Sequence, residues 1–224
     1  MNKLRSILFA NRWFFGCYGL FFFAGLTLVL VQGKAGAFLL LNPYHRGPLD
    51  LFFTNYTYLG DGLFTLAVIV VLLIRRRHTA ASQVLIAFLL SALVAQILKS
   101  ALSLPRPREF FNQGQYEGPY TYFIQGVTLR GFSSFPSGHS TSIFALATML
   151  AMLGSVKQWN WLYLLAAIAV GYSRIYLGQH FLNDVLAGSL TGVIVAVSVH
   201  CLFSERIGFW VDRRKRRKEG KGTG

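Results

Sequence analysis

The chain has 224 residues, of which 54% are hydrophobic and only 13% are charged, with 22 Lys plus Arg against 8 Asp plus Glu. A soluble domain normally carries about a quarter charged residues. Here the uncharged residues form long runs, which indicates a membrane protein and excludes a disordered, collagen-like or disulfide-stapled chain. Cys17 and Cys201 both lie inside apolar runs, so we expect two buried thiols.

Six apolar runs follow one another along the chain, each about long enough for a helix to cross a roughly 30 Å hydrocarbon core. They cover residues 13–31, 54–74, 81–98, 140–156, 158–173 and 185–203. Backbone polar groups in lipid must be paired within their own segment, so these runs predict helices rather than strands. The predicted fold class is all-α: an integral membrane bundle of six transmembrane helices over residues 1–205, followed by a basic tail over 206–224.

The start of the chain allows an alternative interpretation. A basic segment precedes the first apolar run, and Ala35-Gly36-Ala37 resembles a small-residue cleavage site, as in a secretory signal peptide. The apolar run is longer than the usual core of a signal peptide, which favours a retained first helix.

The distribution of basic residues predicts the orientation in the membrane. With six spans both termini share one side, and most of the Lys and Arg residues fall on that side. They are Lys3, Arg5, Arg12, Arg75, Arg76, Arg77, Lys157, Arg206, the run Arg213 to Lys218, and Lys221. The positive-inside rule then places both termini in the cytoplasm and three loops outside. The basic run directly follows the last span, so we expect it to contact anionic lipid headgroups rather than nucleic acid.

Polar residues gather at the outer ends of the predicted spans. Lys99 ends the third span, Arg174 ends the fifth, and His139 opens the fourth. His180 and Asp184 open the sixth, and their four-residue spacing allows the carboxylate to hold an imidazole N–H. Such a pair sets the tautomer and leaves the other ring nitrogen as a nucleophile, a base or a ligand.

Further residues extend this cluster. Arg106 follows Lys99 by seven residues, which returns to the same helix face if the helix continues through the neighbouring prolines. Ser137 and Gly138 stand where the fourth helix begins, and a helix N-terminus favours an anion. Cations, two histidines and a carboxylate at one membrane face predict a site for an oxyanion.

Three segments resemble, in order, the signature of the type 2 phosphatidic acid phosphatase family: Lys99-x6-Arg106-Pro107, Pro136-Ser137-Gly138-His139 and Ser173-Arg174-x5-His180-x3-Asp184. That family also includes vanadium haloperoxidases and bacterial acid phosphatases. The motifs span residues 99–184 and match at every signature position.

The resemblance implies a role for each of these residues. His180 would attack phosphorus and form a phosphohistidine, with Asp184 orienting its ring. His139 would protonate the leaving oxygen and then activate water. The phosphoryl oxygens would be bound by Lys99, Arg106, Ser137, Gly138 and Arg174. No metal or cofactor is expected, because the cations supply the positive charge.

The predicted function is hydrolysis of a membrane lipid phosphate or diphosphate at the outer face of a bacterial inner membrane. Undecaprenyl diphosphate is the first expected substrate, with lipid A and phosphatidylglycerophosphate as alternatives. A lipid phosphotransferase would use the same residues, and an anion transporter is a more distant alternative. The aromatic-rich loop over residues 103–135 predicts either an interfacial belt or a lid for the headgroup.

Overall fold

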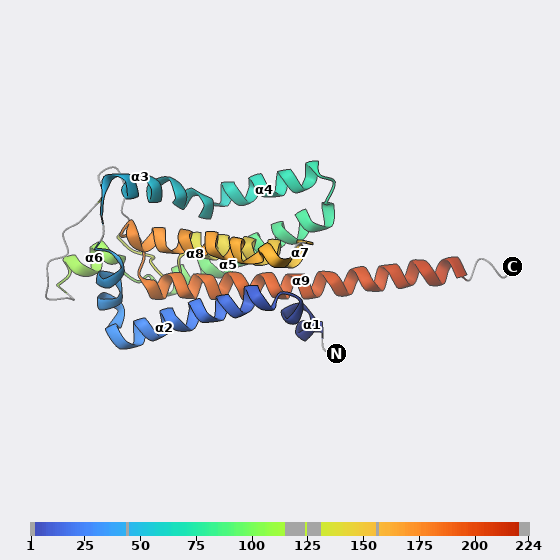
Figure 1. Cartoon of the computed structure of the whole chain (residues 1–224), viewed down its shortest axis with the longest axis horizontal. Helices are drawn as coiled ribbons and strands as arrows, with labels where there is room; N and C mark the ends of the chain where they lie inside the picture. Colours follow the sequence, from blue (N-terminus) through green and yellow to red (C-terminus); the bar gives the residue numbers. More distant parts are fainter. Residues whose placement is uncertain (1–2, 44, 115–123, 125–130, 156, 220–224) are drawn as a thin grey trace.

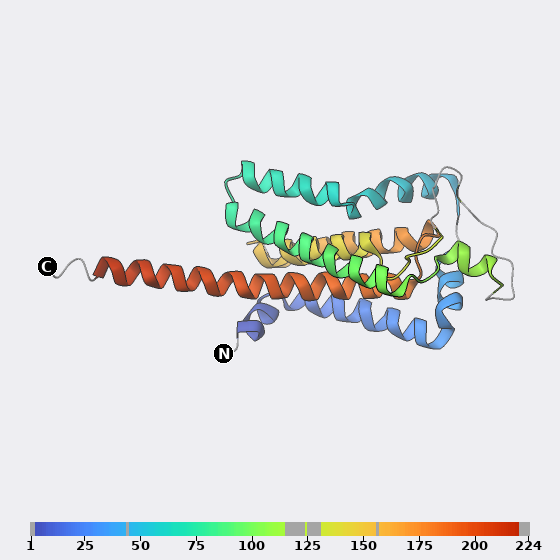
Figure 2. The ribbon, with the colours of Figure 1, turned by 180° about the vertical axis from the view of Figure 1, so that it is seen from behind.

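The computed structural model describes residues 3–43, 45–114, 124, 131–155 and 157–219, with the side chains of the last helix described only to residue 203. All the regular structure in these residues is helical, which confirms the predicted all-α class. The long helices run side by side. Both termini lie at one end of the bundle and the short helix α6 lies at the other (Figures 1 and 2).

The helices keep the order of the predicted runs. They are α1 (Lys3–Ala10), α2 (Arg12–Leu41), α3 (Gly47–Tyr56), the 3-10 turn η1 (Thr57–Gly60), α4 (Gly62–Ile74), α5 (His78–Leu102), α6 (Pro107–Asn112), α7 (Gly138–Leu153), the 3-10 turn η2 (Lys157–Trp159), α8 (Asn160–Tyr176) and α9 (Leu182–Glu219). The first run extends beyond its predicted end, through a kink at Gly33 where φ is 69°. The second starts earlier than predicted, in α3.

Not every helix passes a test of length and apolar composition for a membrane span. Among the described residues, three segments pass: Arg12–Leu41, Leu182–Phe203, and His78–Asn112, which takes α5 and α6 together. A fourth span results if Gly47–Gly60 and Gly62–Ile74, bent by 57° relative to each other, count as one. The helices α7 and α8 are shorter, at 16 and 17 residues. The count of six spans therefore stays a prediction.

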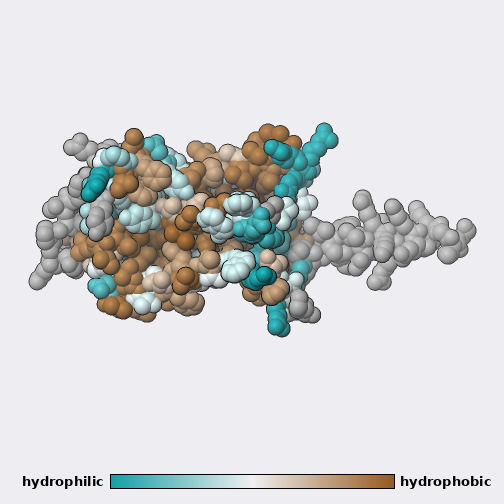
Figure 3. Space-filling view, viewed as in Figure 1, coloured by the Kyte–Doolittle hydropathy of each residue, from teal (hydrophilic) through white to brown (hydrophobic). Residues whose placement is uncertain are grey.

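The sides of the bundle are apolar. Leu20, Leu30 and Leu63 are each more than 70% exposed, and Figure 3 shows hydrophilic side chains gathered near the end from which α9 extends. An apolar surface of this extent suits lipid as the surrounding medium. The expectation of two buried thiols is wrong for Cys17, which is exposed, and Cys201 is half-buried. An apolar run in such a protein faces lipid as readily as the core.

The helix α7 is the centre of the bundle and packs against α5, α8 and α9. Its contact with α9 is the closest, because Gly188 and Gly192 present no side chain. A Cβ at Gly188 would lie 2.5 Å from the Ser137 carbonyl oxygen, and one at Gly192 would lie 2.5 Å from that of Thr141. Small residues four positions apart let two helix backbones approach in this way. The first turns of α7 and α9 are thereby held together.

We expect Gly192→Ala to destabilise the protein, because the new methyl group would also lie 2.8 Å from the Ala145 nitrogen. Overpacking of this kind costs about 1–3 kcal/mol, to be measured as a lower free energy of unfolding in an SDS titration. Gly16→Ala is the matched control, because nothing lies within 4 Å of a Cβ built there. Equal stability of the two variants would contradict the close contact.

Candidate active site

The turn between α8 and α9 brings Arg174 and His180 together. Gly178 adopts φ 64°, a left-handed conformation that glycine reaches without strain and that commonly ends helices. The main-chain N–H groups of Gln179 and His180 then donate to the Arg174 carbonyl oxygen at 3.0 and 3.1 Å. The five residues between Arg174 and His180 therefore form the end of α8 and one tight turn.

His180 and Asp184 form a buried pair. The His180 Nδ1 atom lies 3.4 Å from Asp184 Oδ2, and the two side chains are 2% and 1% exposed. The same carboxylate oxygen accepts hydrogen bonds from the Phe181 main-chain N–H at 3.0 Å and from the Ser134 hydroxyl at 2.5 Å. Asp184 is thus fixed from three sides, and Nε2 is the nitrogen of His180 that remains for chemistry.

The environment favours a neutral ring at His180, which lies in the turn between the two helices. Burial lowers the pKa of His180 below its ordinary value, the neighbouring guanidinium groups of Arg106 and Arg174 lower it further, and Asp184 opposes them. A neutral imidazole keeps the lone pair that a nucleophile or a base needs.

Two buried arginines flank this pair. Arg106 donates from Nε to the Phe132 carbonyl oxygen at 3.1 Å and from Nη1 to the Gln179 carbonyl oxygen at 3.2 Å. Arg174 donates from Nη1 to the Thr57 hydroxyl at 2.6 Å and from Nη2 to the Gln179 side-chain oxygen. The Nε atom of Arg174 is buried and has no hydrogen-bond partner in the described part of the chain. A buried guanidinium with an unused donor suits an anionic ligand.

Arg106 does not reach the site on a continuation of α5, which is the arrangement that the seven-residue spacing from Lys99 suggested. The helix α5 ends at Leu102, and Ser103 has φ 40°, so the helix does not continue to Arg106. Arg106 is instead the N-cap of α6, and its main-chain N–H donates to the Gly131 carbonyl oxygen at 2.8 Å. Proline residues end the first helix and start the next, which overrides the seven-residue periodicity.

His139 and Lys99 line a cavity of about 220 Å³ beside this cluster. The ammonium of Lys99 lies 3.8 Å from the place where a Cβ of Gly138 would be. Gly60 packs directly on His139 from the other side. The positive charges of Lys99, Arg106 and Arg174 all act on the His139 ring. The remaining lining residues are Gly60, Asp61, Gly62, Phe88, Ala92, Ala95, Gln96, Gly138 and Ser142.

Ser137 is a structural link at the start of α7. Its hydroxyl caps the helix by accepting from the Ser140 N–H at 3.4 Å. Its own N–H donates to the Asp184 carbonyl oxygen at 2.9 Å, which joins the second and third motifs. The positive end of the α7 dipole, including Gly138, therefore lies beside the His180–Asp184 pair.

Three residues of this site were not found from the sequence: Ser134, Gln179 and Thr57. Ser134 precedes the second motif, and Gln179 stands inside the gap between Arg174 and His180. Thr57 comes from η1, far from any motif. Only the turn-forming Gly178 could have hinted at Gln179, because such a turn exposes the next main-chain groups.

Two further histidines, His45 and His200, lie outside this cluster. His45 pairs with Asp50 at 3.5 Å, and Asp50 accepts from the Tyr176 hydroxyl, so these groups tie α3 to α8. His200 bonds to Gln83 at 2.8 Å, on parts of α9 and α5 remote from the motifs. Nearly half of the 103–135 loop, residues 115–123 and 125–130, lies outside the described residues.

The described aromatic residues of that loop contribute to packing. Phe110 packs edge to face against Phe181, and Phe111 packs against the same ring at a tilt and also contacts Phe38 in the bent end of α2. Lys34, from the same bent end, lies over the Phe181 ring at 4.1 Å and the Phe110 ring at 4.8 Å. This aromatic wall shields the outer side of the His180 turn.

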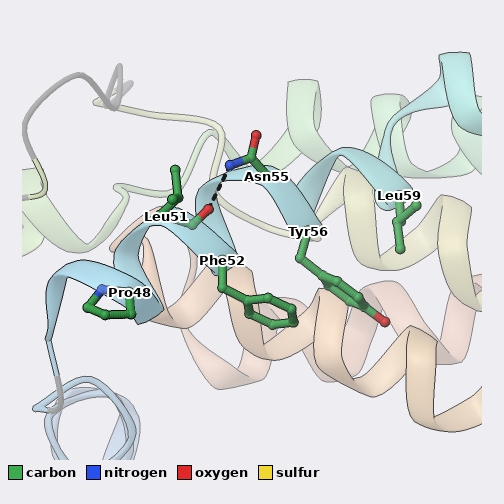
Figure 4. Close-up of a pocket in the computed structure, with 6 residues that line it drawn as sticks. All are labelled: Pro48, Leu51, Phe52, Asn55, Tyr56 and Leu59. Carbon is green, nitrogen blue, oxygen red and sulfur yellow. Dashed lines mark hydrogen bonds between the residues drawn. The ribbon is translucent and has the colours of Figure 1, made fainter.

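A second pocket, of about 510 Å³, lies along one face of α3 and η1 (Figure 4). It is lined by Pro48, Leu51, Phe52, Asn55, Tyr56 and Leu59. The only amide among them, that of Asn55, donates to the Leu51 carbonyl oxygen at 2.7 Å. No side chain in its lining ionises near neutral pH, so it lacks the groups for acid–base chemistry.

The geometry agrees with a family-level comparison. A model of the PAP2 superfamily matches residues 80–207, which include all three motifs. The chain belongs to this superfamily. The match confirms the type 2 phosphatidic acid phosphatase family that the motifs predicted.

Two solved structures resemble the chain throughout most of their length. Aquifex aeolicus LpxE is 30% identical, with a TM-score of 0.59, over 72% of this chain and 91% of that one. A transmembrane PAP2 type phosphatidylglycerolphosphate phosphatase from Bacillus subtilis is 25% identical, with a TM-score of 0.63, over 92% and 98%. These membrane-embedded relatives and the apolar helices support an integral membrane protein.

One curated relative matches a smaller part of the chain. A lipid A 1-phosphatase from Rhizobium etli is 34% identical over 102 residues, which are 46% of this chain and 41% of the relative. The chain thus covers less than half the length of this relative.

We expect Ser134→Ala to lower the free energy of unfolding by about 1–3 kcal/mol, because the buried Asp184 carboxylate loses a donor. The measurement is an SDS titration beside Ser82→Ala, which removes an exposed hydroxyl from α5. If the two variants unfold alike, Ser134 does not hold Asp184.

Proposed function

We propose that this protein is a lipid phosphatase that hydrolyses a phosphate monoester or diphosphate of a membrane lipid through a phosphohistidine at His180. The observation that carries the proposal is the meeting of the His180–Asp184 pair, His139 and the buried cations at one end of the bundle. A neutral nucleophile, an acid–base group and fixed positive charge are the parts that metal-independent phosphoryl transfer requires.

The first step forms a bond from His180 Nε2 to phosphorus and breaks the bond from phosphorus to the leaving oxygen. His139, in its protonated form, gives its proton to that oxygen, so the lipid product leaves as an alcohol or a phosphate. Asp184 stabilises the positive charge that develops on the His180 ring. Lys99, Arg106 and Arg174, with Ser137 and Gly138 at the start of α7, stabilise the negative charge on the phosphoryl oxygens.

The second step reverses these roles. His139, now neutral, takes a proton from water, and the water oxygen attacks phosphorus as the bond to His180 breaks. Inorganic phosphate leaves, and both histidines return to their starting forms. The step consumes one water molecule and needs no other reactant.

We infer that the site faces away from the cytoplasm, in a bacterial inner membrane with both termini cytoplasmic. The turn between α4 and α5, which carries Arg75 to Arg77, lies at the same end of the bundle as both termini (Figure 1). The start of α7 and the His180 turn lie at the opposite end. Enrichment of basic residues on the cytoplasmic side supports this orientation.

Undecaprenyl diphosphate is the first substrate that we propose, with lipid A and phosphatidylglycerophosphate as alternatives. The names of relatives cover all three headgroups: a lipid A 1-phosphatase, an undecaprenyl-diphosphatase and a phosphatidylglycerolphosphate phosphatase. The motif residues contact the phosphoryl group that these lipids share. Discrimination among them must come from residues that contact the rest of the headgroup.

Release of inorganic phosphate from these three lipids by the detergent-purified protein tests the function. We expect His180→Ala to reduce release by about a thousandfold or more, because the nucleophile is lost. His78→Ala, an exposed histidine at the other end of α5, is the control and should retain full activity. Substantial turnover by His180→Ala would remove His180 as the nucleophile. Loss of lipid phosphate without release of inorganic phosphate would indicate transfer to another acceptor.

We expect excess EDTA to leave the rate of phosphate release unchanged, because Lys99, Arg106 and Arg174 supply the charge that a divalent ion would otherwise provide. The rate is measured on protein dialysed against EDTA and again after Mg²⁺, Mn²⁺ or Zn²⁺ is restored. A rate that falls on dialysis and recovers with one metal would overturn the metal-independent mechanism.

A further inference from the structure

Gln179 contacts both buried arginines of the site. Its side-chain oxygen accepts a hydrogen bond from Arg174 Nη2, and its main-chain carbonyl oxygen accepts one from Arg106 Nη1 at 3.2 Å. Its own N–H donates to the Arg174 carbonyl oxygen at 3.0 Å. One residue thus joins the guanidinium group from the first motif to the guanidinium group from the third.

The two contacts depend on different features of the chain. The main-chain contact with Arg106 follows from the turn at Gly178 and would exist with any residue at position 179. The contact with Arg174 needs a side chain that reaches back over the turn and ends in an acceptor. Gln179 is half-buried beside the site and meets both requirements.

The chemical type of this acceptor matters as much as its position. The described contacts of the Arg174 guanidinium are to neutral oxygens: the hydroxyl of Thr57 and the side-chain amide of Gln179. A carboxylate at the same place would bind Arg174 more strongly. It would also neutralise the charge that attracts an oxyanion and would repel the oxyanion itself.

We propose that Gln179 is a positioning residue that orients the Arg174 guanidinium for the phosphoryl group and, being a neutral amide, leaves its charge available to the bound anion. This inference rests on the proposed function, since it assigns Arg174 to phosphoryl binding. Gln179 acts through Arg174 and takes no part in bond making or breaking.

The test uses orthovanadate, a phosphate-like oxyanion, with binding to the purified full chain followed by ⁵¹V NMR. Gln179→Glu keeps the shape of the side chain and adds a negative charge. Gln179→Met keeps the length and removes the acceptor. Gln158→Glu adds the same charge at an exposed position in η2 and is the matched control.

We expect Gln179→Glu to raise the dissociation constant for vanadate by about tenfold or more, which corresponds to loss of one charge-assisted contact. Gln179→Met should weaken binding by a smaller factor and lower kcat for phosphate release, because Arg174 keeps its charge but loses its orientation. The readout that separates positioning from a purely structural role is the vanadate dissociation constant set beside kcat, because a partly unfolded sample would lower the active fraction without changing the affinity of the molecules that remain folded.

The outcomes separate this inference from the function on which it rests. If the wild type binds no vanadate, the oxyanion site and the proposed function both fail. If the wild type binds vanadate and Gln179→Glu binds it equally well, the function stands and the role of Gln179 is refuted. An equal loss in Gln179→Glu and Gln158→Glu also refutes it, because the effect would then be general electrostatics. Should Gln179→Glu not fold, wild-type affinity in Gln179→Met would overturn the inference by itself.

Discussion

The close contact between α7 and α9 is the constraint on which the rest of the site depends. Gly188 and Gly192 allow the two backbones to meet, and the Ser137 N–H bonds to the Asp184 carbonyl oxygen where the helices begin. In lipid no hydrophobic force distinguishes a neighbouring helix from the solvent, so close packing of small residues has to hold such helices together. His139 and His180 are brought together because each stands at the start of one of these two helices.

The electrostatics of the site follow from how its arginines are buried. Removing a guanidinium from water is costly unless a partner compensates its charge. Arg174 has hydrogen-bonded neutral oxygens around it, and it forms no ion pair within the described residues. These hydrogen bonds fix the orientation of the guanidinium without neutralising its positive charge. Binding of a phosphoryl group would require both. Asp184, by contrast, is tied to His180, so the buried carboxylate of this site pairs with the ring and not with the arginines.

The cavity beside Lys99 and His139 has a mixed lining that suits an amphiphile. Its charged and polar groups come from α5, from α7 and from the residue before α4, and Phe88, Ala92 and Ala95 of α5 line its apolar part. Asp61 also lines it and caps α4 through the Leu63 N–H at 3.2 Å. Because His139 is the group that we propose to protonate the leaving oxygen, these residues stand where the remainder of a headgroup would be held. Selectivity among lipid phosphates is thus expected to depend on residues outside the three motifs.

Much of this protein could be predicted from its sequence. Long uncharged runs determined the helical class, since lipid admits few other structures. The spacing of His180 and Asp184 determined their contact, because four residues make one helical turn. The order of the motifs determined the family. These features are local in the chain, so periodicity and residue type suffice to find them.

Other features were decided by the tertiary structure alone. Arg106 reaches the site from a new helix, although the sequence suggested a continuation of α5, because two prolines redirect the chain. Ser134, Thr57 and Gln179 hold the reactive groups through contacts between segments distant in sequence or through a turn. Cys17 faces outward although its run is apolar. Each depends on which face of a helix meets another helix, and one sequence carries no direct record of that packing.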